Sequence, residues 1–202
     1  MRSSLTLTTA SALFILVGVV RPVEPPAAVA EPVELRLMAG KTTYAWEAGG
    51  MTPAQLRRTL DRLAKQLKRD PALVERLPDP PTVDLTLQVM NRGPEEVTVY
   101  VGGDPNEYRF ELEGPGVVTL PRPVVFTQEL RLPHAVRLGP GQSYDIRIRQ
   151  LMDGLRGASR AVYWTRPGTY TLRATYRLSD AEGGKGRLLK SAPVTLKVEE
   201  PK

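Results

Sequence analysis

Apolar and polar residues alternate with a period of two along most of this chain. In segment 83–89, Val83, Leu85, Leu87 and Val89 would face a core, while the residues between them meet solvent. The same alternation recurs in segments 97–101, 108–112, 144–148, 170–178 and 192–198. A strand starting at Val33 would resume after a bulge at Gly40. Short strands separated by Gly, Pro and Asn turns predict an antiparallel β-sandwich.

One segment breaks this pattern and predicts a helix. Thr52 is suited to cap the helix, with Pro53 in its first position and Gln55 placed to complete a capping box. Apolar residues then follow at a spacing of four, three and four: Leu56, Leu60, Leu63 and Leu67. Because Asp70 precedes a proline, the helix should end near Arg69, with a short second turn completing an insert over 52–77. The fold class predicted is therefore mainly β, with one inserted helix at about 52–69.

The N-terminal 30 residues have the composition of a secretory signal. Arg2 precedes an apolar run at 10–20, and a proline-rich stretch then leads to Ala30. As a helix, the apolar run would reach only about 16 Å, roughly half of the ~30 Å hydrocarbon core. We therefore expect cleavage near Ala30, a single domain over 31–202, and export to the periplasm or the extracellular space. Attachment to a membrane is expected only if the segment stays uncleaved.

Composition excludes several kinds of chemistry. The 202 residues contain no cysteine and only one histidine, His134, so a disulfide framework, a Cys-ligated metal and a two-histidine metal site are all impossible. No catalytic residue, metal site or cofactor is expected. The 28 basic and 22 acidic residues give a net charge of +6. In an exported protein this charge favours a protein partner, an anionic polysaccharide or an envelope surface over nucleic acid. The alternative is that the charge only keeps the domain soluble.

The exposed face of the expected helix is strongly basic. Four buried leucines would contribute about 6–12 kcal/mol, whereas an ion pair such as Asp61 with Lys65 contributes only about 0.2–0.5 kcal/mol. Packing on the sandwich, and not charge, is therefore the reason for the helix to form. The basic residues are either a solvated face or a binding face, and they are the candidate binding residues: Arg57, Arg58, Arg62, Lys65, Lys68 and Arg69.

Four other places contain residues that are candidates for binding or catalysis. Tyr163 and Trp164 would either pack in the core or contact a carbohydrate ligand. The turn at 102–107 offers oxygen atoms for calcium, but Asx-turn chemistry explains it adequately and is the favoured interpretation. The segment 150–160 presents Arg156 at the tip of a loop, as a protease inhibitor would. His134 has no serine in a nucleophile-elbow context near it, so a hydrolase triad is not expected.

The segment 166–174 resembles the E–F corner and F strand of immunoglobulin-like sandwiches, with Tyr170 in the place of the tyrosine corner. Leu172 occupies the position where antibody domains carry their second cysteine. The segment 191–198 likewise resembles the last strand of such domains in exported bacterial proteins, and 83–100 is loosely similar to the early hairpin of BsuPI-like proteinase-inhibitor sandwiches. The resemblance implies architecture and transfers no active-site residue.

These observations together favour a non-enzymatic, exported binding or structural module. It would interact through its loops and the basic helix face. The alternatives are a carbohydrate-binding module that uses Tyr163 and Trp164, and a protease-inhibitor-like display of a loop.

Overall fold

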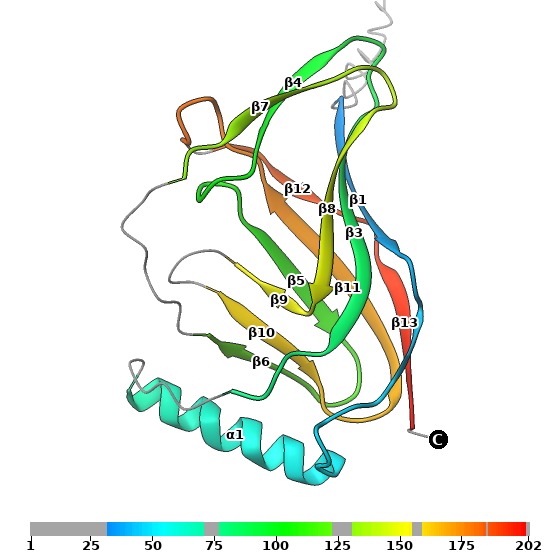
Figure 1. The fold of residues 1–202 in the computed structure, drawn as a ribbon, viewed down its shortest axis with the longest axis vertical. Coiled ribbons are helices and arrows are strands. Elements are labelled where there is room, and N and C mark those ends of the chain that lie inside the picture. Colours follow the sequence, from blue (N-terminus) through cyan, green and yellow to red (C-terminus); the bar gives the residue numbers. More distant parts are fainter. Residues whose placement is uncertain (1–31, 71–76, 123–130, 155–158, 185, 201–202) are drawn as a thin grey trace, which may run out of the picture. The chain divides into compact units, whose positions relative to one another are not determined.

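A computed structural model describes residues 32–70, 77–122, 131–154, 159–184 and 186–200 of the chain. The expected signal segment, the second turn after Asp70 except for the buried Leu77, and the loop tip at Arg156 lie outside these residues. The described part is a mainly β domain with one helix (Figure 1). Its elements are β1 (Val33–Ala39), β2 (Thr43–Ala45), α1 (Pro53–Arg69), β3 (Thr82–Asn91), β4 (Val97–Val101), β5 (Tyr108–Glu113), β6 (Val117–Pro121), β7 (His134–Leu138), β8 (Ser143–Gln150), β9 (Met152–Asp153), β10 (Arg160–Trp164), β11 (Gly168–Arg177), β12 (Leu188–Lys190) and β13 (Val194–Glu199).

Two sheets form the body of the sandwich. One has the order β1-β3-β8, and in the other β11 pairs with β5, β12 and β13, while β13 also pairs with β2. The inward-facing residues of both sheets, such as Leu87 of β3 and Leu172 of β11, are fully buried in a single hydrophobic core. The prediction of a β-sandwich with one inserted helix is therefore confirmed. Among the described strand pairs, only β2 with β13 is parallel.

The first strand does not continue through a bulge but changes sheets. β1 pairs with β3, whereas β2 pairs with β13 in the opposite sheet. At the crossing, the Gly40 amide donates to the Asp84 carbonyl and the Lys197 amide donates to the Thr42 carbonyl, each at the edge of a different sheet. The alternation of the sequence identifies both halves as extended chain but does not reveal that they belong to different sheets.

A smaller sheet with the order β6-β10-β9 connects the sandwich to the helix. α1 packs against β6 (Figure 1). Four consecutive residues of β10 are buried, from Ala161 to Trp164. Since both faces of this strand are covered, its sequence does not alternate, and this is the reason that the period-two pattern did not predict it.

A buried ion pair holds β9, β10 and β5 together. The side chain of Asp153 is fully buried, and its two oxygens accept from Arg160 Nε and Nη2 at 2.9 and 2.7 Å. The Phe110 amide also donates to Asp153 Oδ2, at 2.6 Å. A bidentate pair that receives a further backbone hydrogen bond compensates for the desolvation of the carboxylate.

The Tyr170 hydroxyl connects the start of β11 to the loops at Pro115 and Arg166 by hydrogen bonds. Its hydroxyl oxygen lies 2.5 Å from the Arg166 carbonyl and 2.6 Å from the Pro115 carbonyl. A hydrogen bond from a tyrosine to the backbone a few residues upstream is the contact that defines a tyrosine corner.

Candidate functional site

Local sequence fixes where the helix begins. The Gln55 amide donates to Thr52 Oγ1 at 3.3 Å, and the Thr52 amide donates to Gln55 Oε1 at 2.7 Å, so the predicted capping box is present. The helix ends at Arg69, and Asp70 follows as an extended residue. Both boundaries agree with the prediction.

The helix has an apolar face and a basic face. All four predicted leucines are buried, with Leu60 completely inaccessible. Each leucine is followed two positions later by a basic residue, which gives a stripe on the opposite side of the helix: Arg58, Arg62, Lys65 and Arg69. All four are exposed, and Arg57 and Lys68 are exposed beside them. At ~1.5 Å per residue, the stripe extends for about 16 Å along the helix axis.

Three of the four basic residues of this stripe form no ion pair in the described part of the chain. Arg57 pairs with Asp61 at 3.0 Å, one turn away, and Arg62 donates to the Gln66 amide oxygen at 3.3 Å. Within the described residues, no carboxylate forms an ion pair with Arg58, Lys65 or Arg69. The side chains of the stripe line a shallow surface groove of ≈ 630 Å³. The sequence-predicted binding residues are thus brought together on one accessible surface.

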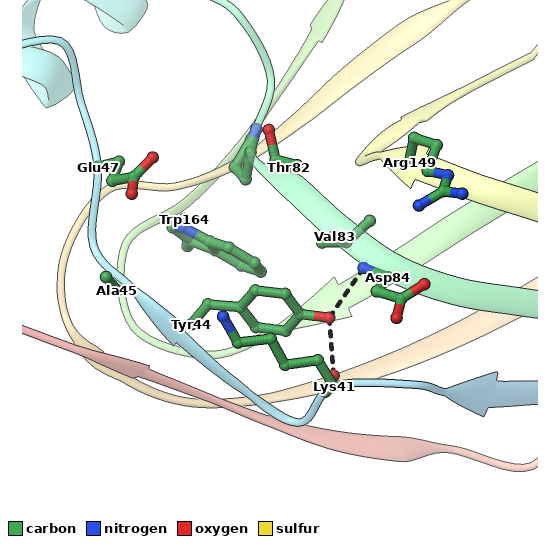
Figure 2. Close-up of a pocket in the computed structure, with 10 residues that line it drawn as sticks. Lys41, Tyr44, Ala45, Glu47, Thr82, Val83, Asp84, Arg149 and Trp164 are labelled. Carbon is green, nitrogen blue, oxygen red and sulfur yellow. Dashed lines mark hydrogen bonds between the residues drawn. The ribbon is translucent and has the colours of Figure 1, made fainter.

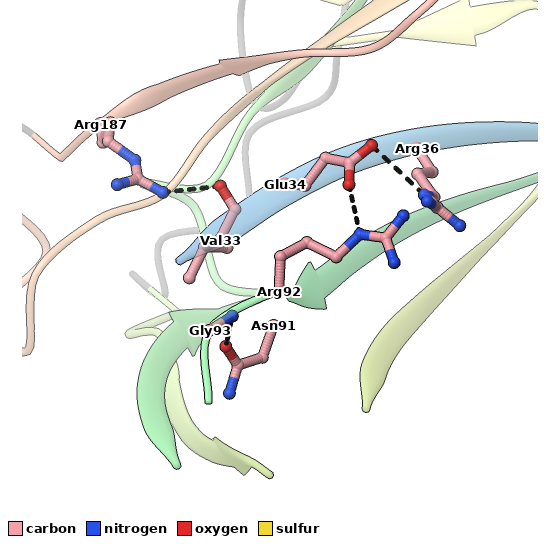
Figure 3. A network of polar contacts seen from close by, with 7 residues as sticks. All are labelled: Val33, Glu34, Arg36, Asn91, Arg92, Gly93 and Arg187. Atoms are coloured by element: carbon pink, nitrogen blue, oxygen red, sulfur yellow. Dashed lines mark hydrogen bonds and ion pairs between the residues drawn. The ribbon is translucent and has the colours of Figure 1, made fainter. Parts of the chain in front are cut away.

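Arginines elsewhere in the domain have different surroundings. In the network of Figure 3, Glu34 accepts from Arg36 at 3.3 Å and from Arg92 at 2.6 Å, while Arg187 donates to the Val33 carbonyl at 2.9 Å. This network ties β1 to the end of β3 and to the segment before β12. Its charges are engaged within the fold, in contrast to those of Arg58, Lys65 and Arg69.

The second pair of candidate residues lies in the core. Tyr163 is 2% and Trp164 3% exposed. The Tyr163 hydroxyl donates to the Pro78 carbonyl at 2.8 Å, and burial raises the pKa of Tyr163 to about 12. The ring of Trp164 packs against Tyr44 and Tyr170 at centroid distances of 5.6 and 5.8 Å. A sugar platform needs an exposed ring face, and these contacts leave neither residue with one.

The edge of Trp164 nevertheless lines a cleft that the sequence did not reveal (Figure 2). The cleft lies where the chain crosses from β1 to β2, beside the start of β3 and the end of β8. Charged side chains surround it, including Lys41, Asp84 and Arg149. These residues come from segments more than 100 positions apart, so no local motif could have indicated them.

The turn at 102–107 and His134 are accounted for by contacts within the fold. In the turn at 102–107, Asp104 accepts from the Arg131 amide and Asn106 hydrogen-bonds the Tyr100 carbonyl and the Ser179 amide. His134 opens β7 at the surface, edge-on to Tyr144 at 6.0 Å. Among the described residues, no group of three His, Asp or Glu side chains is placed to hold a metal ion. The same part of the chain contains no helix that is both long enough and apolar enough to cross a bilayer.

No protein-family model matches this chain, and a search of curated proteins finds no similar sequence.

Proposed function

We propose that this protein is a non-enzymatic, exported binding module that holds an anionic polysaccharide on the basic face of α1. The residues that would contact the polymer are those predicted from the sequence: Arg57, Arg58, Arg62, Lys65, Lys68 and Arg69. The observation that carries the proposal is the exposed stripe, in which Arg58, Lys65 and Arg69 form no ion pair within the described residues.

Three features of the stripe support a polymeric partner. Its charges follow one another along about 16 Å, which suits several successive charges of a chain better than a single small anion. The leucine face is committed to the core, so the basic face is left for a partner. Four of the six side chains are arginines, which bind carboxylate, sulfate and phosphate groups through two parallel hydrogen bonds.

Export is part of the proposal and is supported by the charged, apolar and small-residue order of segment 1–30. The immunoglobulin-like assignment is supported by the tyrosine-corner contact of Tyr170 and by the strand order of the two sheets. Both matter for the function, because an exported sandwich with a displayed helix would meet envelope polysaccharides directly.

Chromatography on immobilised polygalacturonate and dextran sulfate tests the proposal. We expect salt-sensitive retention on at least one of these polymers, because exposed charges are screened by salt. The triple substitution Arg58→Glu, Arg62→Glu and Lys65→Glu should lower the affinity about tenfold or more.

The matched control reverses three exposed arginines outside the helix: Arg137→Glu, Arg147→Glu and Arg177→Glu. Both triple variants change the net charge by three times −2, from +6 to 0. If binding depends on the stripe, the control keeps most of its retention. Equal losses in the two variants, or no retention of the unmodified protein on either polymer, would contradict the proposal.

A further inference from the structure

The cleft beside Trp164 has the size of a small-molecule site. One part has a volume of ≈ 430 Å³ and a neighbouring part ≈ 300 Å³, and the two parts share Glu47, Pro81, Thr82 and Trp164. Pockets that hold small ligands in proteins have volumes of about 300–1,000 Å³. None of the six basic residues of α1 lines either part, so the cleft is a separate site.

Charges of both signs surround the cleft without neutralising one another. Its rim carries the cations Lys41 and Arg149 and the carboxylates Glu47, Asp79 and Asp84, all of them exposed. No ion pair joins any of these five side chains to another within the described residues. Two positive and three negative groups give the rim a charge of −1, in a chain whose net charge is +6. The cleft therefore differs in sign from the rest of the protein.

The floor of the cleft is aromatic and is held in place by hydrogen bonds. The Tyr44 hydroxyl donates to the Lys41 carbonyl at 2.7 Å and accepts from the Asp84 amide at 3.1 Å (Figure 2). Lys41 Nζ lies 5.3 Å from the centroid of the Tyr44 ring. The ring thus already accepts a cation from the protein itself. A preformed floor of this kind lowers the entropic cost of ordering a site around a ligand.

The two parts of the cleft carry different charged groups. Figure 2 shows Glu47 on one side of Trp164 and Arg149 on the other. Glu47 lines both parts of the cleft, Asp79 lines only the smaller part, and the larger part contains Arg149 with Lys41 and Asp84. A ligand that spans the cleft would therefore meet the carboxylates of Glu47 and Asp79 with no cation at one end, and Arg149 together with Asp84 at the other.

We propose that the cleft binds a small zwitterion, a short peptide with a free ammonium and a free carboxylate. The ammonium lies against Glu47 and Asp79, and the carboxylate lies against Arg149. The chain between them crosses the edge of Trp164.

Titration calorimetry with the tripeptides Ala-Ala-Ala, Ala-Leu-Ala and Ala-Lys-Ala tests this inference. We expect saturable binding of at least one tripeptide at ~10 mM or below, and about tenfold weaker binding when its amino end is acetylated or its carboxyl end amidated. Arg149→Gln should weaken binding of the free peptide about tenfold, and Glu47→Gln should weaken it in the same direction.

Arg147→Gln is the matched control, because Arg147 is an exposed arginine on the same strand that does not line the cleft. It should leave the affinity within about twofold. Absence of saturable binding by all three tripeptides would overturn the inference, as would an equal loss in the Arg147 and Arg149 variants. Near-ultraviolet circular dichroism on each variant separates lost binding from lost packing. Because these variants leave α1 intact, the polymer columns and the peptide titration can fail independently.

Discussion

Arginine residues have different roles in two regions of this domain. Where β9 meets β10, Arg160 makes a bidentate pair with a fully buried Asp153, and burial is possible only because both partners are present. Along α1, basic side chains follow one another at the surface. Arg57 pairs with Asp61 of the same helix, whereas Arg58, Lys65 and Arg69 form no ion pair within the part of the chain that the structure describes. Charge in the first region is part of the fold. Charge in the second region adds little to the fold, which leaves it available to a partner.

Removing the buried carboxylate should have the largest effect. Asp153→Ala leaves the Phe110 amide and the Arg160 guanidinium without their acceptor. We expect the free energy of unfolding to fall by about 2–4 kcal/mol, towards the lower end because 31% of the Arg160 side chain remains in solvent. Urea unfolding followed by circular dichroism measures this loss. A change below about 0.5 kcal/mol would mean that the pair is no more important than a surface ion pair.

The next largest effect is expected from alkaline pH, which should lower the free energy of unfolding through the buried tyrosines. Burial raises the pKa of Tyr163 and of Tyr176 to about 12, from 10 in the unfolded chain. Between pH 10 and 12 the unfolded chain binds fewer protons than the folded one at these groups, so stability falls as pH rises through this window. Each group contributes about 1–3 kcal/mol, which is fully present below pH 10.

Urea unfolding at pH 9 and pH 11.5 measures this dependence. Tyr163→Phe provides the control, since it removes one of the two groups and should make the loss of stability smaller. An identical pH dependence in this variant would show that burial of Tyr163 does not govern the alkaline loss.

Substitutions on the basic face of α1 should have the smallest effect on the free energy of unfolding. Arg58→Gln, Arg62→Gln and Lys65→Gln together remove like charges that stand three and four residues apart on one helix. Such pairs repel each other by about 0.2–0.5 kcal/mol, so the triple variant should be as stable as the unmodified protein or slightly more stable. Its urea midpoint is the measurement, and a destabilisation above about 1 kcal/mol would show that these side chains support the fold after all.

Sequence patterns predicted the elements that bury one face. The period of two indicated β3, β8 and β11. The Thr52 cap predicted the start of α1, the leucine spacing its buried face, and the proline after Asp70 its end. The basic stripe was equally visible, because it follows from the same helical period two positions later. These features are local, so a single sequence carries them.

Features that depend on distant contacts were not predicted. β10 is covered on both faces and therefore does not alternate, and β2 belongs to a different sheet from β1 although the two are separated by only a few residues. Predicting the cleft would have required both the position of β2 and the burial of β10, since Tyr44 lines it from β2 and Trp164 from β10. Nothing in the sequence indicates which strands become neighbours, so neither the crossing nor the cleft could be read from it.

Titration calorimetry of polygalacturonate or dextran sulfate, whichever retains the protein, tests the contrast between the two regions most directly. The unmodified protein and the triple Gln variant of α1 are compared at low ionic strength, where surface charges interact most strongly. We expect the variant to bind at least about tenfold more weakly while its urea midpoint is unchanged. Equal affinities of the two proteins would contradict the claim that the basic residues of α1 bind an anionic partner.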